Sequence, residues 1–136
     1  MATAPAVVVH SLADATAALA EGCAVTLLSA EGAGVFAGAG WWRALVAQAR
    51  AAHAATPCDD VLDCADAPGA AMAAIRAGQG TLVLDPACPA FGRIAALARV
   101  LPARPAALDL GQPGARHRLP LWLARRREDD STAALR

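Results

Sequence analysis

Apolar and polar positions follow two alternating patterns along this chain. Short runs rich in leucine and valine predict five strands, over residues 7–9, 24–28, 60–63, 81–84 and 106–110. Alanine-rich segments between these runs predict four helices, over residues 12–21, 41–54, 67–77 and 89–101. Strands that alternate with helices of this length are typical of βαβ units. The pattern therefore predicts an α/β fold with a parallel sheet.

The predicted strands are continuous apolar runs, which indicates a sheet that is covered on both faces. We expect an open, doubly wound, flavodoxin-like or Rossmann-like three-layer sandwich of about five mostly parallel strands and four helices. Half of a (βα)8 barrel is the alternative, but a complete barrel takes about 250 residues and this chain has 136. That length fits one domain, which we place at 1–124, followed by a disordered C-terminal tail at 125–136.

Composition narrows the chemistry more than it narrows the fold. The chain contains 39 alanines but no lysine, tyrosine or asparagine, and all 12 of its cationic side chains are arginine. Because amino acids with GC-rich codons are over-represented, we attribute the bias to a GC-rich bacterial genome. The lack of lysine excludes Schiff-base aldolases, a pyridoxal-phosphate anchor and the lysine of a P-loop. Histidine, aspartate, cysteine and arginine remain as candidates for an active site.

Charge and hydropathy predict a cytoplasmic protein that binds neither nucleic acid nor membranes. The arginines balance 12 acidic residues to a net charge of zero, whereas nucleic-acid-binding domains usually carry a basic surplus. The first nine residues lack the positive n-region of a signal peptide. No uncharged apolar stretch approaches the ~18 residues that a membrane span needs. In such a chain we expect the four cysteines to be reduced thiols.

Each predicted strand ends at or just before a polar residue; these residues are His10, Ser29, Asp63, Asp85 and Asp109. The carboxyl ends of parallel strands meet at one edge, where open α/β sheets bind their ligands. We assign catalytic roles to His10, Asp63 and Asp85, since His10 with either aspartate forms an acid–base pair or a divalent-metal site. The alternative is that these side chains only stabilise turns. Whether the protein is an enzyme stays open, and no cofactor is indicated.

A glycine-rich loop precedes the second predicted helix. Its glycines, with Ser29 and Arg43 nearby, form the candidate ligand-binding set: Gly32, Gly34, Gly38 and Gly40. Backbone N–H groups at such a helix start favour a small anionic or phosphorylated ligand. The spacing is not that of the dinucleotide fingerprint, and a flexible loop without a ligand is the alternative.

Two further features bear on function. Cys64 follows a strand and precedes a helix cap, a position that can lower the pKa of a thiol, but the surrounding aspartates oppose this and favour an unreactive cysteine. Trp41 and Trp42 are adjacent in a predicted helix and point about 100° apart, so we expect one in the core and the other at a ligand pocket or subunit contact. The alternative function is therefore a non-catalytic homo-oligomeric assembly or regulatory module, with a homodimer as the expected state.

Overall fold

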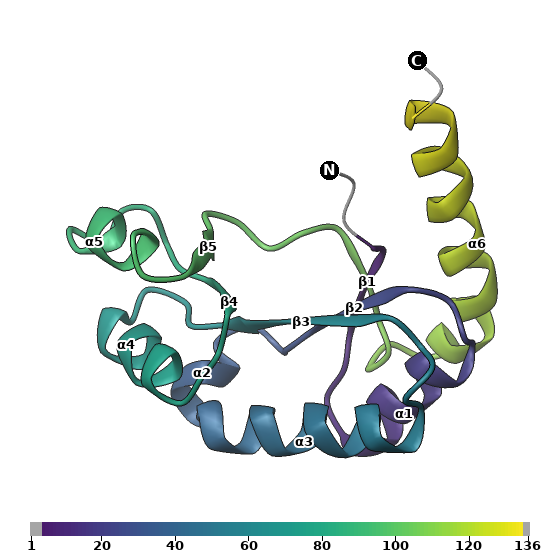
Figure 1. Cartoon of the computed structure of the whole chain (residues 1–136), viewed down its shortest axis with the longest axis horizontal. Coiled ribbons are helices and arrows are strands. Elements are labelled where there is room, and N and C mark those ends of the chain that lie inside the picture. Colours follow the sequence, from purple (N-terminus) through teal and green to yellow (C-terminus); the bar gives the residue numbers. More distant parts are fainter. Residues whose placement is uncertain (1–3, 135–136) are drawn as a thin grey trace.

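The computed structural model describes the backbone of residues 4–134 and the side chains of residues 4–124. The elements in chain order are β1 (Ala6–Val8), α1 (Leu12–Ala20), β2 (Val25–Leu28), α2 (Ala33–Phe36), α3 (Ala39–Ala52), β3 (Cys58–Asp63), α4 (Pro68–Arg76), β4 (Thr81–Val83), α5 (Phe91–Ala95), β5 (Arg99–Leu101), β6 (Ala107–Asp109) and α6 (Ala115–Ala134). The strands form one open, all-parallel sheet in the order β5-β4-β3-β2-β1-β6 (Figure 1).

The order of the strands reverses beside β1. Strands β1 to β5 follow one another across the sheet, and β6 then pairs with the free side of β1. This is a doubly wound order, so the predicted open α/β fold with a parallel sheet is confirmed. In half of a (βα)8 barrel the sixth strand would follow β5 along the sheet. Here β6 lies beside β1, so the half barrel is excluded.

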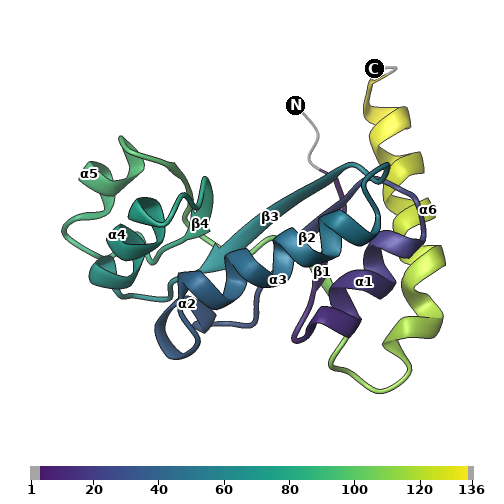
Figure 2. The same ribbon diagram turned by 60° about the horizontal axis from the view of Figure 1, so that its bottom comes forward.

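The helices pack on one face of the sheet and enclose the larger core. Figures 1 and 2 show α1 and α3 side by side on one side of the strands, and α6 contacts β6. Trp42, Leu45 and Val46 of α3 and Leu19 of α1 are buried there against the sheet. Helix α1 begins where its N-terminal cap predicts. The Ser11 hydroxyl accepts the N–H of Asp14 at 3.1 Å and caps the helix.

The opposite face of the sheet is crossed by an extended segment, residues 102–106, which we call the strap (Figure 1). Beneath it lies a second buried cluster that contains Val8, Leu28, Val61 and Val83. The strap joins β5 to β6 with five residues, which span about 17 Å when extended but only about 7 Å as a helix. The third layer is therefore an extended segment where we expected helices.

Three other segments differ from the prediction, and the first is the glycine-rich loop, which contains the short helix α2. The predicted helix 89–101 is divided into the short α5 and the strand β5, because Pro102 disfavours the helical region for the residue before it and the edge of β4 supplies a partner. The segment after residue 114 forms α6, which contains Pro120 and buries Ala115, Leu119 and Leu123 on one stripe.

The backbone of residues 125–134 belongs to α6. The side chains of this stretch and the last two residues lie outside the described part of the chain, so the disordered tail stays a prediction. Among the described residues, no helix is both long and apolar enough to cross a membrane.

Candidate functional site

A hollow of about 350 Å³ lies at the carboxyl edge of the sheet. It is lined by residues at or after the ends of β2, β3, β4 and β5: Glu31, Asp63, Ala65, Asp66, Val83, Asp85, Pro86, Pro102 and Arg104. This is the edge at which open parallel sheets bind their ligands. Its volume is at the lower end of the range for small-molecule pockets, about 300–1,000 Å³.

Asp63 and Arg104 form an ion pair in this hollow. Asp63 is only 2% exposed; its Oδ1 accepts the N–H of Ala65 at 2.7 Å and its Oδ2 accepts Arg104 Nη1, also at 2.7 Å. Arg104 Nη2 also donates to the carbonyl oxygen of Ser29 at 3.0 Å. Arg104 therefore fastens the strap to the ends of β2 and β3, and it neutralises Asp63.

The other carboxylates of the hollow have no cation beside them. In the part of the chain with described side chains, Glu31, Asp66 and Asp85 make no ion pair with any arginine or histidine. Asp85 Oδ1 accepts the N–H of Ala87 at 2.8 Å, which closes a turn without compensating the charge. The hollow therefore carries three uncompensated negative charges.

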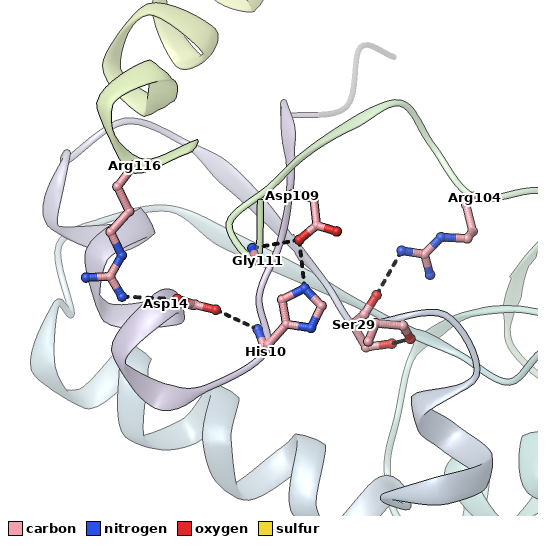
Figure 3. A network of polar contacts seen from close by, with 8 residues as sticks. His10, Asp14, Ser29, Arg104, Asp109, Gly111 and Arg116 are labelled. Atoms are coloured by element: carbon pink, nitrogen blue, oxygen red, sulfur yellow. Dashed lines mark hydrogen bonds and ion pairs between the residues drawn. The ribbon is translucent and has the colours of Figure 1, made fainter. Parts of the chain in front are cut away.

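A second polar group lies where β1 and β6 end side by side, and Figure 3 shows its contacts. His10 Nε2 is 2.7 Å from Asp109 Oδ1, which also accepts the N–H of Gly111 at 2.8 Å. The backbone N–H of His10 donates to Asp14, whose other carboxylate oxygen accepts Arg116 at 3.0 Å. His10 is exposed, so this His–Asp pair can exchange protons with a molecule in solution.

Asp109 has a lowered pKa. Partial burial acts to raise the pKa of this carboxyl, but the hydrogen bonds from His10 and the Gly111 N–H, together with the charges of His10 and Arg104, lower the pKa on balance. Asp109 therefore stays ionised and fixes the orientation of the His10 ring.

Replacing His10 with alanine is expected to raise the pKa of Asp109 towards its ordinary value. A carboxyl whose pKa is lowered by folding stabilises the fold above its unfolded pKa, and this contribution is lost as the pH falls through the folded pKa. The wild type should thus exceed His10→Ala in free energy of unfolding at neutral pH, with the difference shrinking in acid. A carbon-13 NMR titration of the Asp109 carboxyl measures the shift, and His117→Ala is the control. An unchanged pKa in His10→Ala would contradict the assignment.

The predicted catalytic residues are only partly brought together. Asp63 and Asp85 line the same hollow, but His10 pairs with Asp109 and with neither of these two aspartates. The pairing that we predicted for His10 was wrong, because β6 lies beside β1 and brings its own aspartate closer. Ser29 is fully buried, and its hydroxyl oxygen accepts the backbone N–H of Asp63 at 2.9 Å. Ser29 therefore helps to fix the backbone of Asp63.

Glu31, at the start of the glycine-rich loop, lines the hollow, but none of the loop's glycines does. Gly32 adopts the left-handed helical conformation before α2, with φ +73°. Gly38, before α3, combines φ +88° with ψ 161°, a backbone conformation that is open essentially to glycine alone. At Gly34 a Cβ atom would lie 2.9 Å from Cys64 Sγ and 3.0 Å from the Asp63 carbonyl oxygen. The backbone conformation at Gly32 and Gly38 and the close packing at Gly34 therefore explain these three glycines without a ligand.

Two other members of the predicted ligand-binding set, Gly40 and Arg43, do not line the hollow either. Nothing lies within 4 Å of the position that a Cβ atom would take at Gly40. Arg43 Nη1 donates to Gln79 Oε1 at 3.3 Å. The binding of an anion by this loop stays a prediction.

Cys64 is a buried thiol in this structure. Burial raises its pKa to about 11 from the ordinary 9.0, and the charge of Asp63 adds to the rise. Cys58 and Cys88 also have raised pKa values, chiefly because of burial. Burial is thus the main cause of the raised pKa of Cys64, and the charge of Asp63 acts in the same direction.

Cys64 is expected to resist alkylation in the native protein. A rise of its pKa from 9.0 to about 11 lowers the thiolate fraction about a hundredfold near pH 8, and burial slows access further. Mass spectrometry after timed exposure to iodoacetamide measures the rate, and the same protein in urea is the control. Labelling of native Cys64 as fast as in urea would contradict the buried thiol.

Four residues described here were given no role in a site from the sequence: Glu31, Asp66, Arg104 and Asp109. Arg104 lies in a connection flanked by Pro102 and Pro105, and only the short length of that connection hinted that it crosses the sheet. Asp109 was placed at the correct edge, but its partner depends on the strand order. Comparisons with family models, with curated proteins and with solved structures find no match.

Proposed function

We propose that this protein binds a small cationic molecule in the hollow at the carboxyl edge of its sheet. One observation carries the proposal: Glu31, Asp66 and Asp85 surround a concave site and have no cationic partner among the described side chains. Like charges gathered in a hollow repel one another and attract a counter-ion from solution. A bound cation would relieve that repulsion.

The arrangement of the carboxylates favours an organic amine. Within the described residues, no three acidic, histidine or cysteine side chains are grouped closely enough to hold a metal ion. Carboxylates spread around the rim suit a flexible diamine, whose ammonium groups can reach separate partners. The anionic ligand that the sequence suggested would face three negative charges here, with Arg104 already paired to Asp63.

A calorimetric titration with the diamine putrescine tests the proposal. The double variant Asp66→Asn/Asp85→Asn keeps the shape of the hollow and removes two charges. Because a hydrogen bond to a charged group contributes about 1.5–3 kcal/mol, each substitution is expected to weaken binding at least about tenfold. The matched control is Asp59→Asn, which removes an exposed carboxylate outside this hollow. Equal affinity in all three proteins, or no binding by the wild type, would contradict the proposal.

A second function, self-association, is favoured by exposed apolar side chains on α2 and α3. Val35 is 56% exposed, Phe36 72% and Trp41 38%, and all three lie on these adjoining elements. Trp42 is buried, so the two tryptophans divide between core and surface as the sequence predicts. Sedimentation equilibrium of the wild type and of Phe36→Ser tests this function. A dimer that Phe36→Ser dissociates would support it, and a monomeric wild type would contradict it.

A further inference from the structure

The face of the sheet opposite the helices carries a groove that the proposed amine site does not use. The groove has a volume of about 290 Å³. Its walls come from strands β1 to β5 and from the strap. Parallel sheets are normally covered on both faces. Here the strap leaves this part of the face open.

The floor of the groove is apolar. Ala6 of β1, Val61 of β3 and Leu101 of β5 line it from the sheet, while Pro102 and Pro105 line it from the strap. Water in contact with such surfaces is readily displaced by the apolar part of a ligand. The groove therefore favours a molecule with an apolar body.

Two opposite charges stand over this floor, Asp59 on β3 and Arg99 on β5. Both side chains are exposed, and neither makes a hydrogen bond or ion pair within the described residues. The neighbouring Asp60 contrasts with them, because its carboxylate accepts Trp42 Nε1 at 3.0 Å and Arg50 Nη2 at 3.1 Å on the helical face. The charges of Asp59 and Arg99 are thus available to a ligand.

The register of the strands sets the distance between these charges. Arg99 is level with Thr81, and the pairing of Leu62 with Leu82 places Val61 level with Thr81 as well. Asp59 therefore lies two residues before the level of Arg99 and two strands away. Strand spacings of about 4.8 Å and rises of about 3.3 Å then separate the two Cα atoms by about 12 Å. A ligand that bridges the pair needs its own charges several ångströms apart.

We propose that this groove binds an apolar dipeptide as a zwitterion. The ammonium group of the dipeptide meets Asp59, and its carboxylate forms a bidentate contact with Arg99. The apolar side chains lie over Val61 and Leu101. A dipeptide fits better than a free amino acid, whose two charges lie on one carbon atom and are too close together to reach both partners.

The test uses L-leucyl-L-leucine and two blocked forms, one acetylated at the amino group and one amidated at the carboxyl group, titrated into the full chain. The free dipeptide is expected to bind, and each blocked form at least about tenfold more weakly, because one charge-assisted contact is lost. In Asp59→Asn the free and acetylated forms should bind alike, and in Arg99→Gln the free and amidated forms should bind alike.

Matched substitutions separate this site from the amine site. Asp66→Asn and Arg76→Gln each remove a charge of the same sign as Asp59→Asn and Arg99→Gln, but outside the groove. They should therefore leave the affinity for the dipeptide unchanged. Asp66→Asn should weaken putrescine binding, whereas Asp59→Asn should not. Since Asp59 and Arg99 are exposed and unpaired, their variants should keep the amide NMR spectrum of the folded protein.

The location of binding gives the deciding observation. Amide resonances of Thr26, Val61 and Thr81 are expected to shift saturably with L-leucyl-L-leucine at millimolar concentrations. The proposal is overturned if the dipeptide does not bind, if the blocked forms bind as well, or if the shifts occur at the carboxyl edge instead. Shifts at these three residues that depend on protein concentration without ligand would make the groove a contact between copies, which also overturns it.

Discussion

Replacing Arg104 with alanine is expected to lower the free energy of unfolding by about 3 kcal/mol. The change leaves Asp63 buried at 2% exposure without its cation, and removing one partner of a buried pair is strongly destabilising. It also releases the strap from the Ser29 carbonyl oxygen at the end of β2. Urea denaturation followed by circular dichroism measures the loss.

The double variant Arg104→Ala/Asp63→Asn separates two effects of Arg104: neutralising the buried Asp63 and holding the strap against the Ser29 carbonyl oxygen. An asparagine at position 63 can still accept the N–H of Ala65, and it leaves no buried charge. The double variant should therefore recover part of the stability that Arg104→Ala loses. If Arg104→Ala unfolds at the same urea concentration as the wild type, the strap is not held by this ion pair and the account of the second face is wrong.

Replacing Trp42 with alanine is expected to lower the free energy of unfolding by about 4 kcal/mol, as for other fully buried aromatic side chains. Trp42 is 0% exposed in the larger core, and its Nε1 donates to Asp60 Oδ2 at 3.0 Å. Its loss creates a cavity between α3 and the sheet and removes one donor from a carboxylate that also binds Gln79. Thermal and urea unfolding both measure this effect.

Trp41→Ala is the control for Trp42→Ala, because the two residues are adjacent and have the same size. Trp41 is 38% exposed, so its replacement should change the free energy of unfolding by less than about 1 kcal/mol. Equal losses in the two variants would show that α3 is rotated relative to the sheet. They would also remove Trp41 from the exposed surface that favours self-association.

The sequence predicted the carboxyl edge of the sheet well, because that edge depends only on local pattern. Apolar runs followed by polar residues mark where each strand ends, and parallel strands bring these ends together. Asp63 and Asp85 could therefore be placed in one hollow without knowing the strand order. Helix geometry likewise predicted that only one of Trp41 and Trp42 would be buried in the core.

The partners of these residues could not be predicted, because they depend on long-range topology. His10 and Asp109 are 99 positions apart and meet only because β6 lies beside β1. Arg104 reaches Asp63 only because a five-residue strap crosses the sheet. No local pattern encodes such a crossing. Pro120 likewise obscured the buried stripe of α6, since proline usually interrupts a helix.

The strap links the two proposed sites physically. Pro102 lines both the carboxyl-edge hollow and the groove on the helix-free face, and Arg104 holds the strap in place between them. The strap thus both covers part of the helix-free face of the sheet and forms one wall of the groove on that face. Variants of the strap are expected to affect both sites, so the binding tests use substitutions on the strands and the loops after them.

The carboxyl-edge hollow is proposed to bind a small cation. The most direct test of this proposal is a residue-resolved NMR titration of the wild-type protein with putrescine. The amide resonances of Ala65, Asp66 and Asp85 are expected to shift together and to saturate, while those of Asp59 and Glu21, which are exposed acidic residues outside the hollow, stay in place. Shifts of similar size at all exposed acidic residues, or no saturation, would contradict the proposal.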